Sequence, residues 1–321
     1  MFIVEVEDKR ELIIHAIALN SATVTIENGG QSVPAFDAET VVVRSSGTLN
    51  VRGGVYTSDP GYVSTGYDVV DNDDATYLYK VVAASAGTVA VASVTSYGVT
   101  TEYDSLQDAF DAAGSGDTVT LLANVRTADA LEIGEAVVFD LDGKTLTLTG
   151  NATTQFTVSA SATICNGTVF SAGSAYGLYV NRAGANVTVT NATIATAAGS
   201  SVNGINVAAA SGLKVVDSTV RAGNYGIILS GASVAGSNYT IENSTVIGGY
   251  GRSNVARIYA VYVSSSPATL TIKGSGSRIR TLTTSTTRPA IGTGGNTDAT
   301  VTVEDGYVYG SLLNYSGKGH I

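Results

Sequence analysis

Short runs of alternating apolar and polar residues recur along the chain, and many of them end in Asn or Asp. Clear copies are VTVTNATI at 187–194, LKVVDSTV at 213–220 and YTIENSTV at 239–246, with weaker copies ending at Gly274 and Asp305. The polar ends of the regular copies are 25, 26 and 26 residues apart, at Asn166, Asn191, Asp217 and Asn243. Repetition at this period is typical of a solenoid, in which each repeat buries its apolar face against its neighbours.

Alternation also predicts which side chains enter the core, because successive side chains of a strand point to opposite faces. In VTVTN, Val187 and Val189 should point inward and the threonines between and after them outward. The same register predicts further inward pairs, namely Leu213 and Val215, Tyr239 and Ile241, Leu270 and Ile272, and Val301 and Val303.

A second type of strand lies between these copies, as in YGLYV from Tyr176 and NGINV from Asn203. Its expected inward residues are Leu178, Val180, Ile205, Val207, Ile227, Leu229, Val261 and Val263. A column of very small residues should lie just outward of each corner, at Gly177, Gly204, Gly226, Ala260 and Ala290. Two or three such strands per turn, stacked in parallel, predict an all-β protein built as a parallel β-helix.

The Asn and Asp residues have a structural role in this arrangement. At equivalent corners, stacked ~4.8 Å apart, their side chains can hydrogen-bond to one another and to the backbone of the turns. The expected ladder, which would run through the body of the protein, consists of Asn166, Asn191, Asp217, Asn243 and Asp305.

The segment DSLQDAFDAAGSGD at 104–117 contains the one strong helical signal. Ser105 can cap a helix and Asp108 lies in its first turn. One face is apolar, formed by Leu106, Ala109, Phe110 and Ala113. We expect a short capping helix at about 105–113, placed over the open N-terminal end of the solenoid that follows.

The run YDSLQDAFDAAGSGDTVTLLANV followed by VVFDLDGKTLTL resembles the N-terminal start of right-handed, pectin-lyase-like β-helices in bacterial cell-surface proteins. The run GGVYTSDPGYVSTGYDVVDNDDATYLYKVV, from Gly53, resembles the C-terminal end of such a domain. The resemblance implies a right-handed parallel β-helix solenoid and concerns architecture, not activity.

The order of these two motifs implies three regions. Residues 1–82 are expected to be the terminal rungs and exit cap of a preceding β-helix, and 83–102 a linker or strand. Residues 103–321 are expected to form a second β-helix that is uncapped at its C-terminus. An uncapped end is a template for strand pairing. One hypothesis is that the chain is a fragment of a longer array, and a sharper one is that its C-terminal rung stacks on the N-terminal rungs of another copy.

Composition narrows the possible functions. The 321 residues carry a formal net charge of -10, which argues against nucleic-acid binding because that needs a basic footprint. No stretch reaches the length of an apolar membrane span, so no membrane insertion is expected, and the first residues lack the pattern of a secretory signal. With one Cys and two His, no cofactor and no metal centre are expected.

Two groups of charged residues have structural interpretations. Asp68, Asp71, Asp73 and Asp74 could supply oxygen ligands for calcium, but the strand-like runs on either side favour a hairpin turn. An outward column beside the ladder contains Cys165, Thr190, Val216, Glu242, Lys273 and Glu304, and Glu27 similarly matches Arg52. Opposite charges in such columns specify strand register. Within the column, Cys165 is expected to be half-exposed and unreactive.

Basic residues cluster between Ser244 and Thr297, a stretch with no Asp or Glu. Tyrosines are interleaved with them, and alternation places Tyr262 outward and Tyr259 inward. The candidate binding strip for an acidic polysaccharide or another anionic surface polymer is Tyr250, Arg252, Arg257, Tyr262, Arg278, Arg280 and Arg288. The alternative is that these arginines only solvate an exposed face.

No catalytic residue is expected, because the outward columns offer Thr, Val, Gly and Ala where a lyase or hydrolase needs acidic clusters or paired carboxylates. The preferred interpretation is a non-catalytic, extracellular structural or adhesive module on a bacterial cell surface. The alternatives are a phage fibre or tailspike component, which would belong to a virion, and a polysaccharide lyase or glycoside hydrolase.

Overall fold

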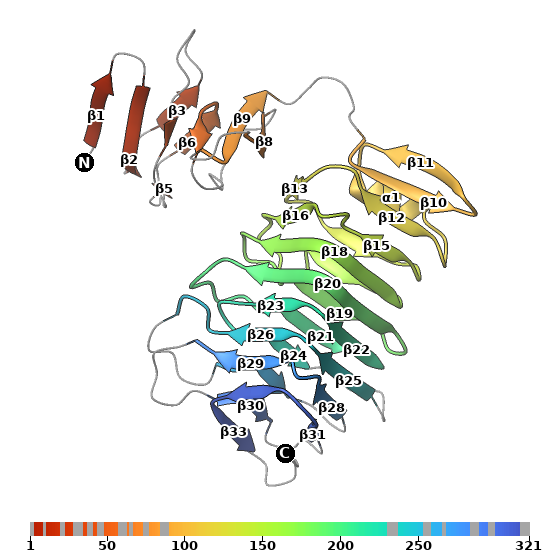
Figure 1. Cartoon of the computed structure of the whole chain (residues 1–321). Helices are drawn as coiled ribbons and strands as arrows, with labels where there is room; N and C mark the ends of the chain where they lie inside the picture. The colour runs from red at the N-terminus through yellow and green to blue at the C-terminus, as the bar shows by residue number, and fades with distance from the viewer. Residues whose placement is uncertain are drawn as a thin grey trace. The chain divides into compact units, whose positions relative to one another are not determined.

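The computed structural model is nearly all-β, with one helix in the part of the chain that it describes (Figure 1). That helix is too short to cross a bilayer, and the described residues contain no other candidate. The chain divides into two compact units, Met1–Val89 and Ala90–Ile321. The structure describes 3–8, 11–19, 23–27, 35–36, 41–43, 48–56, 63, 67–72 and 77–83 of the first unit, and 90–229, 237–252, 258–264, 268–282, 289–294 and 299–314 of the second.

The first unit contains short strands in mixed pairing. They are β1 (Ile3–Asp8), β2 (Glu11–Leu19), β3 (Thr23–Glu27), β4 (Ala35–Phe36), β5 (Val41–Val43), β6 (Thr48–Arg52), β7 (Val55–Tyr56), β8 (Tyr67–Asp71) and β9 (Tyr79–Ala83). β3 pairs in parallel with β6 and sets Glu27 opposite Arg52, which is the register expected from their spacing.

The Asp-rich run of the first unit lies in a hairpin. β8 and β9 are antiparallel, with Asp71 opposite Tyr79, and the backbone N–H of Asn72 donates to the carbonyl of Leu78. The hairpin prediction is therefore confirmed. Asp73 and Asp74 lie outside the described residues.

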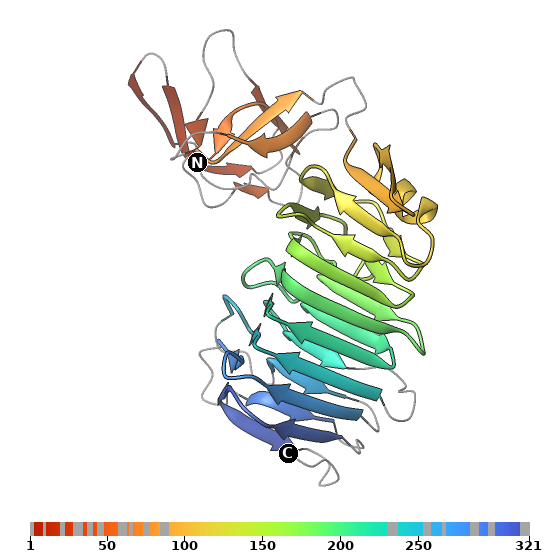
Figure 2. The ribbon, with the colours of Figure 1, turned by 45° about the vertical axis from the view of Figure 1, so that its right-hand side comes forward.

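The second unit is built from three parallel stacks of strands (Figure 1 and Figure 2). The first stack contains β12 (Thr118–Leu121), β15 (Val138–Asp140), β18 (Ala162–Ser171), β20 (Asn186–Thr196), β22 (Gly212–Val216), β25 (Ser237–Glu242), β28 (Ala268–Lys273) and β31 (Thr300–Val303). The second contains β13 (Val125–Thr127), β16 (Thr145–Leu148), the second halves of β18 and β20, β23 (Thr219–Arg221), β26 (Thr245–Gly248), β29 (Arg278–Thr281) and β32 (Tyr307–Tyr309). The third contains β14 (Leu131–Ile133), β17 (Phe156–Val158), β19 (Leu178–Asn181), β21 (Ile205–Ala209), β24 (Ile227–Leu229), β27 (Val261–Val263), β30 (Pro289–Thr293) and β33 (Ser311–Asn314).

The chain visits the three stacks in the same order repeatedly, and we call each such passage a circuit. Each strand pairs in parallel with its counterpart one circuit later, so that Val187 lies opposite Leu213 and Leu213 opposite Tyr239. This order of strands, with its repeat of about one circuit per 25 residues, is consistent with a β-solenoid.

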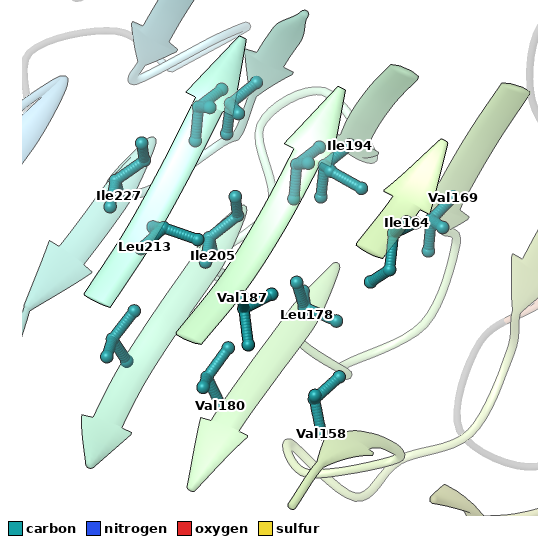
Figure 3. Packing of buried hydrophobic residues seen from close by; sticks show 14 of the residues in the cluster. Val158, Ile164, Val169, Leu178, Val180, Val187, Ile194, Ile205, Leu213 and Ile227 are labelled. Carbon is teal, nitrogen blue, oxygen red and sulfur yellow. The ribbon is translucent and has the colours of Figure 1, made fainter. Parts of the chain in front are cut away.

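Aliphatic side chains fill the space between the stacks (Figure 3). Val187 of the first stack and Leu178 of the third point toward one another, and the other predicted inward residues are buried as well. Burying each such side chain contributes about 1.5–3 kcal/mol. Val303 is an exception, because 41% of its surface is exposed. It lies in the last first-stack strand of the described chain, and no further strand there covers it.

The column of very small residues is buried rather than outward, which corrects the expectation from the sequence. A Cβ on Gly177 would lie 2.6 Å from Ile194 Cγ2 and 2.7 Å from the carbonyl oxygen of Gly204, its counterpart in the next circuit. Gly204 and Gly226 meet the same pair of obstacles, a branched side chain and the carbonyl of the following circuit. The small residues are therefore needed because neighbouring circuits approach closely at this corner.

The predicted helix is present as α1 (Leu106–Ala112) at the start of the second unit. Ser105 caps it by accepting a hydrogen bond from the backbone N–H of Asp108, and Leu106, Ala109 and Phe110 are buried as expected.

α1 also covers a strand edge. The Gln107 side chain accepts a hydrogen bond from the backbone N–H of Glu132 at 2.7 Å and donates to the same residue's carbonyl at 3.3 Å, so it occupies the free edge of β14. β10 (Ala92–Ser96) and β11 (Val99–Tyr103) form a hairpin whose first strand pairs with β12. Both contacts protect edges that would otherwise be free to pair.

We predict that Gly204→Ala destabilises the protein and that Gly134→Ala does not. A Cβ at Gly204 would lie 2.6 Å from the Gly226 carbonyl oxygen, whereas nothing lies within 4 Å of a Cβ at Gly134. Overpacking of a dense site typically costs about 1–3 kcal/mol. Urea unfolding of the full chain, followed by circular dichroism, should show a lower midpoint for Gly204→Ala alone. Equal midpoints for the two variants would contradict this account of the corner.

Candidate functional site

The Asn and Asp residues of the repeat lie where the chain bends from the first stack to the second, a position that we call the bend. Asn166 and Asn191 lie within β18 and β20, and Asp217 and Asn243 directly follow β22 and β25. Their φ angles are 57°, 47°, 46° and 47°. Asn and Asp adopt this left-handed conformation more readily than other residues that carry a Cβ. The backbone of the bend therefore explains why these positions are Asn or Asp.

The side chains at the bend are exposed, so they do not form a spine through the interior. Asn191 Nδ2 donates to Asn166 Oδ1, and Asn166 Nδ2 donates to Asp140 Oδ1, both at 3.0 Å. We call this row the surface ladder. Its hydrogen bonds all point in one direction along the stack, toward the first circuits.

The surface ladder has no further amide bond beyond Asn191. Asp217 carries a carboxylate, which has no hydrogen to donate to Asn191. Asn243 packs against Gly274 in the next circuit. Asp305 follows the corresponding bend after β31 and accepts a hydrogen bond from the adjacent Gly306 N–H at 2.7 Å. Asp217 thus keeps the left-handed backbone of the bend without joining the amide row, whereas the positive φ next to Asp305 belongs to Gly306.

A buried row of serines supports the same bend. Ser218 Oγ donates to the Val216 carbonyl at 2.6 Å and accepts from the backbone N–H of Ala192, one circuit earlier, at 3.1 Å. Ser244 Oγ repeats this arrangement with the Glu242 carbonyl and the Ser218 N–H, at 2.7 and 3.0 Å. Serine hydroxyls therefore satisfy the buried backbone of the bend.

The sequence reading missed this serine row. Its signal is a Ser directly after the Asp or Asn of the bend, as in DST at 217–219 and NST at 243–245. The earlier copies have Gly167 and Ala192 at this place, so the pattern is incomplete in the sequence.

The outer side of the bend is hollowed into an open groove of about 500 Å³. One side carries the exposed side chains of the bend, and the other side carries threonines at the start of the second-stack strands. Thr168 pairs with Thr193 and Thr193 with Thr219, so the three are aligned along the stack. The polar side chains of these two sides are Asn166, Asn191 and Asp217 at the bend and Thr168, Thr193 and Thr219 opposite them.

The expected arginine and tyrosine strip is divided between two stacks. Arg278 and Arg280 lie on β29 in the second stack, whereas Tyr262 lies on β27 in the third. Tyr250 and Arg252 follow β26. Of the remaining strip residues, two lie outside the described residues, namely Arg257 and Arg288.

The described arginines differ in how far their side chains are engaged. Arg278 Nη1 donates to the carbonyls of Ser275 and Ser277 at 2.7 and 2.9 Å, and its guanidinium lies 4.1 Å from the centre of the Tyr307 ring. Arg280 is exposed. Its register partner in the next circuit is Tyr309, which is 51% exposed.

Arg221 is a further basic residue of this surface that the sequence reading did not include. Its guanidinium lies 4.4 Å from the centre of the Tyr250 ring. Arg221 pairs with Ile247, and Ile247 with Arg280, so the two arginines belong to one column two circuits apart. Arg221 lies outside the stretch from 244 to 297 that has no Asp or Glu. Only the strand register could have grouped it with Arg280.

Tyr262 belongs to an aromatic cluster on the outer face of the third stack. Its ring lies nearly parallel to those of Tyr259 and Tyr225, with centroid distances of 4.9 and 5.6 Å. Tyr259 is buried, but its ring lies over Gly292, the register partner of Tyr262. Tyr259 is thus buried as expected, but its ring stacks on Tyr225 and Tyr262 and does not belong to the aliphatic core cluster.

The outward column beside the surface ladder pairs charges as expected at one position. Lys273 Nζ lies 3.1 Å from Glu242 Oε2. Cys165, in contrast, is buried and not half-exposed. Burial and the nearby Asp140 carboxylate raise the pKa of the Cys165 thiol to about 11, so the thiol is protonated at neutral pH.

Comparisons with known proteins do not assign a function. No protein-family model matches the chain, and searches of curated proteins and of solved structures found no match. In the described parts of the chain, no three His, Cys, Asp or Glu side chains gather in a group that could hold a metal ion.

We predict that Asp217→Asn stabilises the protein by about 0.5–1.5 kcal/mol. Asn keeps the left-handed backbone, and its amide can donate to Asn191 Oδ1, which extends the surface ladder by one bond. Asp305→Asn is the matched control, because it removes the same charge next to Gly274, which has no side chain to receive a bond. The midpoints of urea unfolding of the full chain measure the change in stability of both variants. An equal gain in the two variants would show that charge, not the ladder, is responsible.

Proposed function

We propose that the chain is a non-catalytic structural or adhesive module whose second unit is a right-handed parallel β-helix. The observation that carries the proposal is the parallel pairing of eight successive first-stack strands, from β12 to β31, around an aliphatic interior. Each circuit is held to the next by backbone hydrogen bonds, so such a body spans distance and offers long regular surfaces for weak contacts.

We further propose that the module works outside the cell, on a bacterial surface. This part of the proposal rests on the resemblance of 103–125 and 137–148 to the start of pectin-lyase-like β-helices in cell-surface proteins. The small, polar outward side chains of the stacks, such as Thr188 and Thr190, suit a module that contacts solvent on all sides.

An acidic polysaccharide is the ligand that we propose for the surface around Arg280. Arg280 and Arg221 lie in one column ~9.6 Å apart, that is, two strand spacings. Tyr307 and Tyr309, which are 52% and 51% exposed, lie in the circuit after β29 with ring centroids 6.1 Å apart. Guanidinium groups bind carboxylates and sulfates, and exposed tyrosine rings can lie against sugar rings.

We predict that Arg280→Glu weakens binding of polygalacturonate about tenfold, the loss expected when a charge-assisted contact is removed. Lys214→Glu is the matched control, because it makes the same charge change at an exposed position of the first stack. Isothermal titration at physiological salt measures both. Equal losses would indicate general repulsion, and a wild-type protein that does not bind would overturn the proposed ligand. Release of unsaturated uronate during the titration would favour the lyase alternative.

The final circuit is proposed to associate with a second copy. Its exposed apolar side chains include Val303 and Leu312, at 41% and 45% exposure. β31, β32 and β33 are the last strands of their stacks in the described chain, and the edge of a terminal strand can act as a template for pairing.

We predict that sedimentation velocity shows an average mass that rises with concentration. Leu312→Lys should suppress this rise, because a charge at the end of the stack opposes docking. Leu282→Lys, at a similarly exposed leucine on the side of the second stack (38% exposed), should leave it unchanged. A strictly monomeric wild type would contradict end-to-end association, and a fixed trimer would favour the phage-fibre alternative.

A further inference from the structure

We propose that the groove at the bend binds an uncharged linear polysaccharide, which lies along the direction in which the circuits stack. This ligand and this site differ from those proposed for the surface around Arg280. The groove runs from Asp142, which follows β15, to Thr219 on β23, whereas Arg280, Tyr307 and Tyr309 lie on β29 and β32. Arg221 shares β23 with Thr219 but does not line the groove.

A row of unused hydroxyl groups lines one side of the groove. Thr168, Thr193 and Thr219 line the groove in register, at a spacing of ~4.8 Å. Within the described chain their hydroxyls make no hydrogen bond to another residue. Each hydroxyl offers one donor and two acceptor positions, so the row presents the same polar group to a ligand at every circuit.

The opposite side of the groove carries a local excess of hydrogen-bond acceptors. Asn191 uses its amide N–H₂ to reach Asn166, which leaves Asn191 Oδ1 as an acceptor. The next side chain is the carboxylate of Asp217, which also only accepts. No donor from the described residues reaches either group. A ligand that places hydroxyl donors here would satisfy both, and sugars carry such hydroxyls on every ring.

The charge of the groove disfavours an anionic ligand. Two carboxylates line the groove, Asp142 and Asp217, and the described lining residues include no Lys or Arg. Lys144 lies 3.6 Å from Asp142 and offsets one of these charges. An anionic polymer would meet net repulsion, whereas an uncharged one would find acceptors for its hydroxyls. The groove should therefore prefer an uncharged polysaccharide, whereas the surface around Arg280 should prefer an acidic one.

The shape of the groove favours a polymer over a compact molecule. The groove is open and carries a matched pair of side chains in each circuit, one from the bend and one threonine. Between them lie Gly167 and Ala192. A Cβ at Gly167 would face Leu141, and Ala192 is buried, so a flat ring would meet the backbone there. Repeating sugar units meet repeating contacts, so the contacts of successive units add along one chain.

The test compares Thr193→Val with Thr188→Val in the full chain. Both threonines are half-buried outward residues of β20, but only Thr193 lines the groove. The probes are three uncharged hexasaccharides, namely cellohexaose, maltohexaose and mannohexaose, titrated by calorimetry or by ligand-observed NMR. We expect at least one to bind the wild type, with affinity about 3- to 10-fold weaker for Thr193→Val and unchanged for Thr188→Val.

Asp217→Asn separates binding from folding. Its new amide would donate to Asn191 Oδ1, and a single neutral amide oxygen would replace the carboxylate. The ligand would then meet fewer and weaker acceptors, so binding should weaken although the fold is not damaged. Arg280→Glu should leave hexasaccharide binding unchanged, and Thr193→Val should leave polygalacturonate binding unchanged. The two proposed sites can therefore be confirmed or contradicted independently of each other.

Three results would overturn the inference. One is a wild type that binds none of the three hexasaccharides at millimolar concentration. Another is an equal loss of binding in the two threonine variants. The third is binding of the cationic chitosan hexamer alone, abolished by high salt, which would mean that the carboxylates attract charge and not hydroxyls.

Discussion

The direct pairing of each circuit with the next is the constraint on which the second unit depends. Because Val187, Leu213 and Tyr239 lie opposite one another in turn, a side chain that points inward in one circuit sets what must fill the same place in its neighbours. The interior therefore accepts variation in size along a column but not a change of polarity. At the corner of Gly177 and Gly204 even size is restricted, since the backbone of the next circuit occupies the space of a side chain.

The bend shows how one backbone requirement creates two different polar rows. A left-handed residue turns the chain from the first stack to the second and projects its own side chain outward, as at Asn166 and Asn191. The residue after it points inward, where Ser218 and Ser244 satisfy backbone groups that no water reaches. Buried backbone groups need such partners, whereas the outer row can vary. Asp217 is one such variation, and it gives the groove its acceptors.

Much of the fold could be predicted from the sequence, because strand alternation alone decides which side chains face inward. Leu178, Ile205 and Val261 are buried for that reason. Alternation says nothing about the distance between circuits, so the predicted outward position of Gly177 was wrong. It also gives neither the sign of φ nor the packing of aromatic rings, so it predicted neither the exposure of the Asn191 side chain nor the stacking of Tyr259 on its neighbours. Arg221 was missed because basic residues were grouped along the sequence and not by register.

One outward column links the two proposed surfaces. Along the second stack it reads Thr145, Thr168, Thr193, Thr219, Thr245, Arg278 and Tyr307, each residue opposite the next. The column is uncharged and hydroxylated along the groove and becomes basic and aromatic in the last circuits, although the strands behind it keep the same aliphatic interior. Outward positions of a parallel stack do not contribute to that interior, so their chemistry can change from circuit to circuit without a change of fold. A stiff body of this kind can thus hold an uncharged and an acidic polysaccharide at a fixed separation, which a single compact pocket cannot do.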